Sequence, residues 1–239
     1  MKAYELVAER LRAEILDGAR PPGMRFANEL DLAEEHGVSR ATIREALRLL
    51  GAENLIRTTK GARGGSFVTV PSASDLSESL RSGLGRLARA EHVTLDELVE
   101  ARALLEVPAA QLAARRRADD DIARLRESIP GDPLRLGADE QFIYNRDFHT
   151  VVIEACGNTM LAVAAQPIFD VLRTHLSRSS LGRVYHRAIN DHHRGLADAI
   201  EAHDEVAAGE QMRDHLEFLR PYYERAWRAA ARERAHRSA

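Results

Sequence analysis

Near the N-terminus a short helix, a glycine turn and a second helix follow one another, and this order constrains the fold more than any other feature. The first helix is predicted over 28–36 and ends at Gly37, a residue that readily takes the left-handed backbone of a helix C-terminus. Ser39 then stands where a helix N-cap is preferred, and the second helix is predicted over 40–50. This order is typical of a helix-turn-helix.

Elements on both sides of the helix-turn-helix complete a small domain. Apolar residues at helical spacing predict another helix over 4–17, closed by Gly18 and the prolines that follow. Two β-prone runs, 55–59 and 66–70, are joined by a loop of glycines and basic residues, which indicates a β-hairpin wing. We therefore expect a winged helix-turn-helix over 1–71.

The predicted helix over 40–50 has an apolar face beside a cationic one, with arginines at every fourth position. Such a helix can enter the major groove of DNA, where arginine pairs with guanine edges or clamps phosphates, and threonine reaches a phosphate or a base. Glycines let the wing tip approach a backbone closely, and basic side chains there match phosphates. The candidate DNA-binding residues are Ser39, Arg40, Thr42, Arg44, Arg48, Lys60, Arg63, Gly64 and Gly65. The pattern does not say which arginine reads bases, and an ordinary glycine hairpin is the alternative for the wing.

The net charge of −3 hides an asymmetry along the chain. Residues 39–70 contain six basic side chains and two acidic ones, whereas the remainder is acidic on balance. A local basic patch on an acidic protein suggests a polyanion bound by one small module. A solvated charged surface is the alternative interpretation.

The length of 239 residues suits two domains, and a hydrophobic content of 44% can fill a core. The single cysteine, Cys156, excludes an internal disulfide and a cysteine zinc cluster, and favours a reducing compartment. No apolar run approaches the roughly 20 residues of a membrane span, and the first residues do not resemble a signal peptide. We expect a cytoplasmic protein without a membrane partner.

A polar break at 71–74 separates the N-terminal domain from a second, all-helical one. We predict a bundle of about seven helices over 75–231 and a frayed tail over 232–239. The predicted helices span 75–90, 94–116, 119–128, 138–156, 158–178, 183–208 and 209–231. The fold class expected for the whole chain is therefore mainly α.

Three of the predicted helices place histidines on their apolar sides, one of them with an asparagine a turn earlier. These inward-facing residues are Asn145, His149, His193 and His215. Each uncompensated buried polar group costs about 1–3 kcal/mol, so several that converge need a shared partner, and a divalent metal ion suits imidazole ligands. Hydrogen-bonded core histidines are the alternative, and His175 and His186 also face inward, so helical wheels leave open which histidines meet.

The N-terminal motifs resemble the winged helix of the GntR family over about residues 4–70. The similar segments are Pro22-Gly-Met-Arg-Phe26, Leu32-Ala33, Gly37-Val-Ser-Arg40, Thr42, Arg44-Glu-Ala-Leu47 and Gly64-Gly-Ser-Phe-Val68. The resemblance implies a dimeric repressor whose Arg40 and Arg44 contact the bases of a double-stranded operator. Leu30 stands where many members have an arginine, so the operator is expected to differ.

The second domain resembles the FCD ligand-binding domain of the FadR branch over about residues 75–225. The similar segments are Arg102-Ala-Leu-Leu-Glu106, Phe148-His149, Gly157-Asn158, 193–200 and Met212-Arg-Asp-His-Leu216. The resemblance implies a metal ion held by Asn145, His149, His193 and His215, with Asn145 in place of the usual aspartate. It also implies that Arg102 pairs with the carboxylate of a small effector, whereas a surface ion pair with Glu106 is the alternative.

One negative charge fewer at Asn145 predicts a weaker or more effector-dependent metal site, with zinc or nickel favoured by three imidazoles and a bound carboxylate completing the shell. We expect a homodimeric transcription regulator, a repressor, whose operator binding responds to a small carboxylate near the metal. A direct metal sensor is one alternative. A metal-dependent hydrolytic enzyme is a weaker one, because no convincing catalytic base accompanies the histidines, and we predict no catalytic residue.

Overall fold

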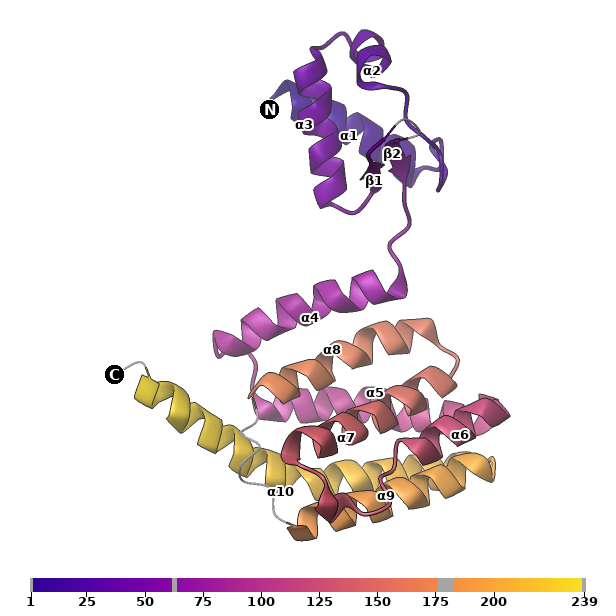
Figure 1. The fold of residues 1–239 in the computed structure, drawn as a ribbon, viewed down its shortest axis with the longest axis vertical. Helices are drawn as coiled ribbons and strands as arrows, with labels where there is room; N and C mark the ends of the chain where they lie inside the picture. Colours follow the sequence, from indigo (N-terminus) through magenta and orange to yellow (C-terminus); the bar gives the residue numbers. More distant parts are fainter. Residues whose placement is uncertain (1, 62–63, 176–182, 238–239) are drawn as a thin grey trace. The chain divides into compact units, whose positions relative to one another are not determined.

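A computed structural model of the chain describes residues 2–61, 64–175 and 183–237 (Figure 1). The chain divides into two compact units, Met1–Ser72 and Ala73–Ala239. The division falls inside the polar break that the sequence places at 71–74. The predicted class, mainly helical with one small sheet, is confirmed.

The N-terminal unit is a winged helix-turn-helix. Its elements are α1 (Ala3–Leu16), α2 (Glu29–His36), α3 (Arg40–Ala52), β1 (Ile56–Thr59) and β2 (Gly65–Val68). The two strands are antiparallel and pair Ile56 with Val68 and Thr59 with Gly65. Apolar side chains from all three helices and both strands form one core, which includes Leu11, Leu32, Ile43, Leu50, Ile56 and Val68.

Local signals at the helix ends explain why this segment folds as predicted. The Asn28 side chain accepts hydrogen bonds from the backbone N–H groups of Leu30 and Asp31 and so caps α2. Gly37 ends α2 with φ of 64°, where a side chain would be strained. Ser39 Oγ accepts from the Thr42 backbone N–H at 3.1 Å and caps α3.

The C-terminal unit is a helical bundle. Its elements are α4 (Ala73–Arg89), α5 (Leu95–Arg116), α6 (Asp119–Glu127), the short 3-10 helix η1 (Pro133–Arg135), α7 (Ala138–Ala155), α8 (Thr159–His175), α9 (Arg183–Glu201) and α10 (Glu205–Arg237). Helix α5 contacts α7, α8, α9 and α10, and α4 lies along α8. The core of this unit therefore surrounds α5, between helices distant in sequence.

The last two helices differ from the prediction in their bounds. Helix α9 ends at Glu201 rather than at 208, because His203 takes a left-handed backbone with φ of 58°. The Asp204 side chain then accepts from the Ala207 backbone N–H at 2.9 Å, which starts α10 four residues before the predicted 209. Helix α10 also continues to Arg237 instead of ending at 231, in keeping with the alanine and arginine content of this segment. The segment 176–178, predicted to end the helix of α8, lies outside the described residues.

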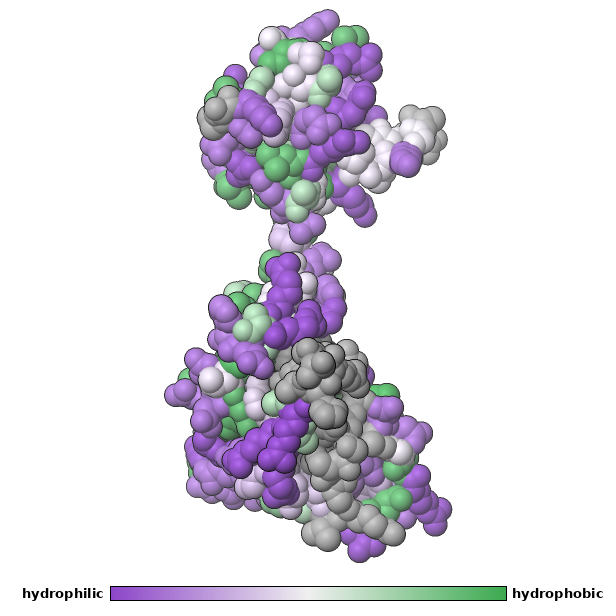
Figure 2. All heavy atoms as spheres, turned by 90° about the vertical axis from the view of Figure 1, so that its left-hand side faces the viewer, coloured by the Kyte–Doolittle hydropathy of each residue, from purple (hydrophilic) through white to green (hydrophobic). Residues whose placement is uncertain are grey.

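Polar side chains are common on the face of the two units that Figure 2 shows. Among the residues coloured there, hydrophilic ones predominate and hydrophobic ones form small groups. None of the helices in the described part of the chain is long and apolar enough to cross a membrane.

Truncating the core of the N-terminal unit should destabilise it strongly. Ile43 is fully buried, so Ile43→Ala is expected to cost about 2–5 kcal/mol through lost burial and the cavity left behind. Hydrogen exchange of the α1 and α3 amides measures the loss. Leu30→Ala removes a side chain that is 51% exposed. It should change the opening free energy of the same amides by less than about 0.5 kcal/mol. Equal effects of the two substitutions would contradict this core.

Candidate DNA interface and buried histidine cluster

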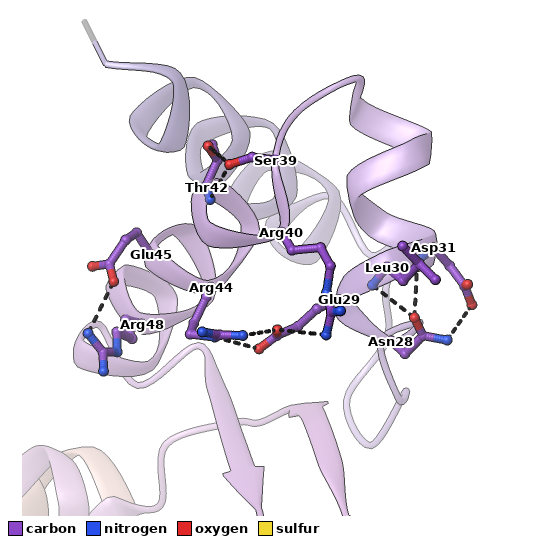
Figure 3. A network of polar contacts seen from close by, with 10 residues as sticks. All are labelled: Asn28, Glu29, Leu30, Asp31, Ser39, Arg40, Thr42, Arg44, Glu45 and Arg48. Atoms are coloured by element: carbon purple, nitrogen blue, oxygen red, sulfur yellow. Dashed lines mark hydrogen bonds and ion pairs between the residues drawn. The ribbon is translucent and has the colours of Figure 1, made fainter.

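The arginines predicted to bind DNA lie on the exposed side of α3. The side chains of Arg40, Arg44 and Arg48 are each more than half exposed. Figure 3 shows Arg40 and Arg44 directed toward Glu29, the first residue of α2, while Arg48 pairs with Glu45. The helix-turn-helix thus brings the arginines together and pairs each of them with an acidic side chain.

Ser39 and Thr42 interact with each other at the start of α3. Besides its bond to the Thr42 backbone, Ser39 Oγ lies 2.9 Å from Thr42 Oγ1 (Figure 3). Ser39 therefore has a structural role as the cap in addition to any contact with DNA.

Local packing in the wing requires glycine at positions 64 and 65, apart from any close approach to DNA. A side chain at Gly64 would collide with the backbone carbonyl of Thr59, and one at Gly65 would meet the Arg25 guanidinium. Arg25 donates to the Gly64 carbonyl at 2.5 Å and bridges β2 at Phe67, a role that the sequence did not reveal. Lys60 is exposed as expected, and Arg63 lies outside the described residues.

In the C-terminal unit, three helices bring three histidines into one buried cluster. The helical wheels predicted that each of them faces inward, and the resemblance to the FCD domain implied that these three meet. His149 comes from α7, His193 from α9 and His215 from α10, and each is at most 1% exposed. His149 Nε2 and His215 Nε2 are 3.1 Å apart, and one ring nitrogen from each of the three lies within 4.8 Å of the others. Burial lowers the pKa of His149, and it lowers those of His193 and His215 well below the usual histidine value, which favours neutral imidazoles.

Several polar atoms around the cluster have no partner among the described residues. These buried atoms include Asn145 Oδ1 and His193 Nε2, on two residues that line the same pocket. Buried polar atoms in native proteins are almost always satisfied, so a group of unsatisfied ones at a single place points to a missing ligand. The donor set, one amide oxygen and three imidazoles, fits a divalent transition metal.

A buried ion pair adjoins the cluster. Arg102 donates to Glu106 from Nε at 2.5 Å and from Nη2 at 3.2 Å, and from Nη1 to the Tyr223 hydroxyl at 2.7 Å. Its guanidinium lies 4.6 Å from the centre of the Phe169 ring. Of the two interpretations of Arg102, the contacts favour the pair with Glu106, which is buried rather than at the surface.

Glu106 also contacts the histidine cluster, and the sequence did not reveal this. Its Oε2 is 2.8 Å from His149 Nδ1. Burial alone would raise the pKa of Glu106, but the Arg102 guanidinium and His149 lower it to about 2, so the carboxylate is ionised. The four-residue spacing of Arg102 and Glu106 on one helix indicates that they can form an ion pair. The contact of Glu106 with His149 depends instead on the packing of α5 against α7.

A pocket opens beside the cluster, and Asn145 and His193 line it. The space between its walls is about 560 Å³, including the part open to solvent. Pro130, Phe142, Tyr185 and Ile189 supply apolar walls, and Gln141, His186 and Asn190 add polar groups. Arg102 is not among the lining residues.

These two units define a class: a DNA-binding regulator with a winged helix-turn-helix and a helical domain that contains a buried polar site. Comparison with known families agrees. Residues 3–68 match the bacterial regulatory proteins of the gntR family, and residues 97–218 match the FCD domain. The chain therefore belongs to the GntR family of transcription regulators with an FCD domain.

Individual relatives are regulators as well. A Uxu operon regulator from Haemophilus influenzae is 25% identical over 90% of this chain and 80% of its own length. A putative L-lactate dehydrogenase operon regulatory protein from Escherichia coli is 29% identical over 89% and 83%. The solved structure of a Streptococcus agalactiae GntR protein is 28% identical, covers 92% of this chain and 99% of its own, and has a TM-score of 0.61. The chain is thus a transcription regulator rather than an enzyme.

Removing Arg44 should weaken operator binding. We expect Arg44→Ala to cost about 1–3 kcal/mol on a duplex selected by the unchanged chain, because α3 loses an exposed guanidinium that is predicted to contact DNA. Fluorescence anisotropy at fixed salt measures the affinity. Arg10→Ala, which removes an exposed arginine from α1, should have a much smaller effect. Unchanged affinity for Arg44→Ala would mean that α3 is not the recognition helix.

Proposed function

We propose that this regulator is a homodimeric repressor whose operator binding is controlled by a small carboxylate bound next to a divalent metal ion in the C-terminal unit. The observation that carries the proposal is the buried cluster of His149, His193 and His215 at the edge of a pocket. Neutral, converging imidazoles beside polar atoms without hydrogen-bond partners are suited to a metal ion. A core that serves packing alone does not need such a cluster.

The metal would be held by Asn145, His149, His193 and His215. Two nitrogens bound tetrahedrally to one zinc ion at about 2.0–2.1 Å lie roughly 3.3 Å apart, and the His149 and His215 Nε2 atoms are separated by 3.1 Å. Glu106 supports this arrangement, because its contact with Nδ1 leaves His149 Nε2 directed at the cluster. Outer carboxylates of this kind fix the ring orientation of metal-bound histidines. Three imidazoles favour zinc or nickel.

The pocket is the proposed effector site. Arg102 is committed to Glu106 and Tyr223, so the positive charge for an anion would come from the bound metal, which attracts a carboxylate into its own coordination shell. Asn145 and His193 line the pocket, so such an anion would reach the ion from this side. The E. coli relative is named for an L-lactate dehydrogenase operon, and lactate is a small carboxylate of the expected class.

Dimerisation is proposed on two grounds. A helix-turn-helix reads a half-site, and a two-fold dimer spans two half-sites about one turn of DNA apart. Helix α4 exposes Leu76, Leu80 and Leu87 on a single stripe, each more than 40% exposed. A second copy of the chain would cover this stripe.

A titration separates this proposal from a direct metal sensor. The purified protein is loaded with zinc, then with L-lactate and other small carboxylates, while operator binding is followed. Release only when an acid is present supports the proposed repressor. Release by zinc alone would favour the sensor instead, and no response to either would contradict both.

Loss of a cluster histidine should abolish tight metal binding. His193→Ala and His215→Ala each remove one ligand, and we expect zinc affinity to fall by more than about 100-fold, beyond the range for an outer partner. Competition with a chromogenic chelator measures it. His92→Ala, at an exposed histidine between α4 and α5, should leave the affinity unchanged. Parental affinity in the two cluster variants would exclude the proposed site.

Asn145→Asp should tighten metal binding without any acid present. The substitution keeps the shape of the side chain and adds one negative charge to a neutral donor set, so we expect zinc affinity to rise about tenfold or more. The same competition assay, run in buffer without carboxylates, measures it. An affinity equal to that of the unchanged chain would show that residue 145 does not coordinate the ion.

A further inference from the structure

Glu29 pairs with the guanidinium groups of Arg44 and Arg40, which the recognition helix would offer to DNA. Its Oε1 accepts from Arg44 Nε at 3.1 Å and its Oε2 from Arg44 Nη2 at 2.7 Å, while Arg40 Nη2 lies 4.0 Å from the same Oε2. Figure 3 shows the carboxylate between the two guanidinium groups. The paired edge of Arg44 is of the kind that grips a guanine edge or a phosphate.

The position of Glu29 is fixed by the fold. It is the first residue of α2, directly after the Asn28 cap, and a carboxylate there is favoured by the helix dipole. The first turn of α2 contains Glu29 and Asp31 as acids and the uncharged Leu30 between them. The negative charge beside the two arginines is therefore not offset by a base within that turn.

Non-specific DNA binding depends on phosphate contacts, which carry no sequence information. A carboxylate paired with Arg44 competes with every phosphate for this side chain and repels the phosphate as well. At the operator, a correctly placed base edge offers Arg44 directed acceptors that replace its ion pair with Glu29. On arbitrary DNA, a phosphate does not offer acceptors in that geometry. The ion pair therefore penalises wrong sequences more than the right one, a form of specificity that uses repulsion.

We propose that Glu29 is a specificity-determining residue, which limits non-specific DNA binding by holding Arg44, with Arg40 beside it, until the correct base edges replace it. This role depends on DNA binding alone and not on the metal or the effector. Removing the charge should raise affinity for arbitrary DNA more than affinity for the operator.

The same helix offers a matched control. Glu45 pairs with Arg48 three residues away through one contact at 3.1 Å, and Glu45 is more exposed than Glu29. Glu45→Gln removes the same charge from the same surface without freeing Arg44. It should change affinity for all duplexes by a similar factor.

The experiment uses the full chain, a duplex that it selects from a random pool, and a scrambled duplex of equal length. Anisotropy titrations at several salt concentrations compare the unchanged chain, Glu29→Gln and Glu45→Gln. For Glu29→Gln we expect affinity for the scrambled duplex to rise about tenfold, with a steeper salt dependence by about one phosphate, and the ratio of operator to scrambled affinity to fall. For Glu45→Gln the ratio should stay constant.

Two results would overturn the proposal. One is an unchanged affinity ratio in Glu29→Gln, and the other is an equal fall of the ratio in both variants. A double variant tests whether Glu29 acts through Arg44. If it does, Glu29→Gln should have little further effect on the ratio of operator to scrambled affinity when Arg44→Ala is present. Both glutamates are at the surface, so thermal unfolding should confirm that the single variants fold.

Discussion

The buried ion pair of Arg102 and Glu106 is the interaction around which the helical unit is arranged. Charges removed from water must be compensated nearby, and here Tyr223 from α10, Phe169 from α8 and His149 from α7 supply the compensation for a pair on α5. Four helices are thus held to one polar centre. The histidine cluster forms at its edge, so the geometry of the pocket depends on the same pair.

Local chemistry explains what the sequence could predict. The helix-turn-helix follows from a glycine and a cap within three residues, and each signal acts without distant partners. The inward direction of His149, His193 and His215 follows from the helical period alone. Whether these three histidines meet, or one of them meets His186 instead, depends on how α7, α9 and α10 pack. The resemblance to the FCD domain, not the helical period, implied the correct set.

The errors have physical causes of the same kind. The predicted boundary between the last two helices fell at Gly209, but this glycine lies inside α10, where a side chain would meet Gln111 of α5. Its purpose is close helix packing, which no local pattern reveals, while Asp204 starts the helix. The contact of Glu106 with His149 was missed because it joins residues on separate helices, and Arg25 was missed because it acts through the tertiary position of the wing.

The neutral donor set at Asn145 has a consequence for signalling. With uncharged imidazoles and an amide, and with Glu106 already balanced by Arg102, a dication would enter the core without a counter-charge. Metal and acid would then each improve the binding of the other, by the reciprocity of linked equilibria. Under the proposed function, the regulator would act as a coincidence detector, silent to either signal alone and responsive when a cell holds both.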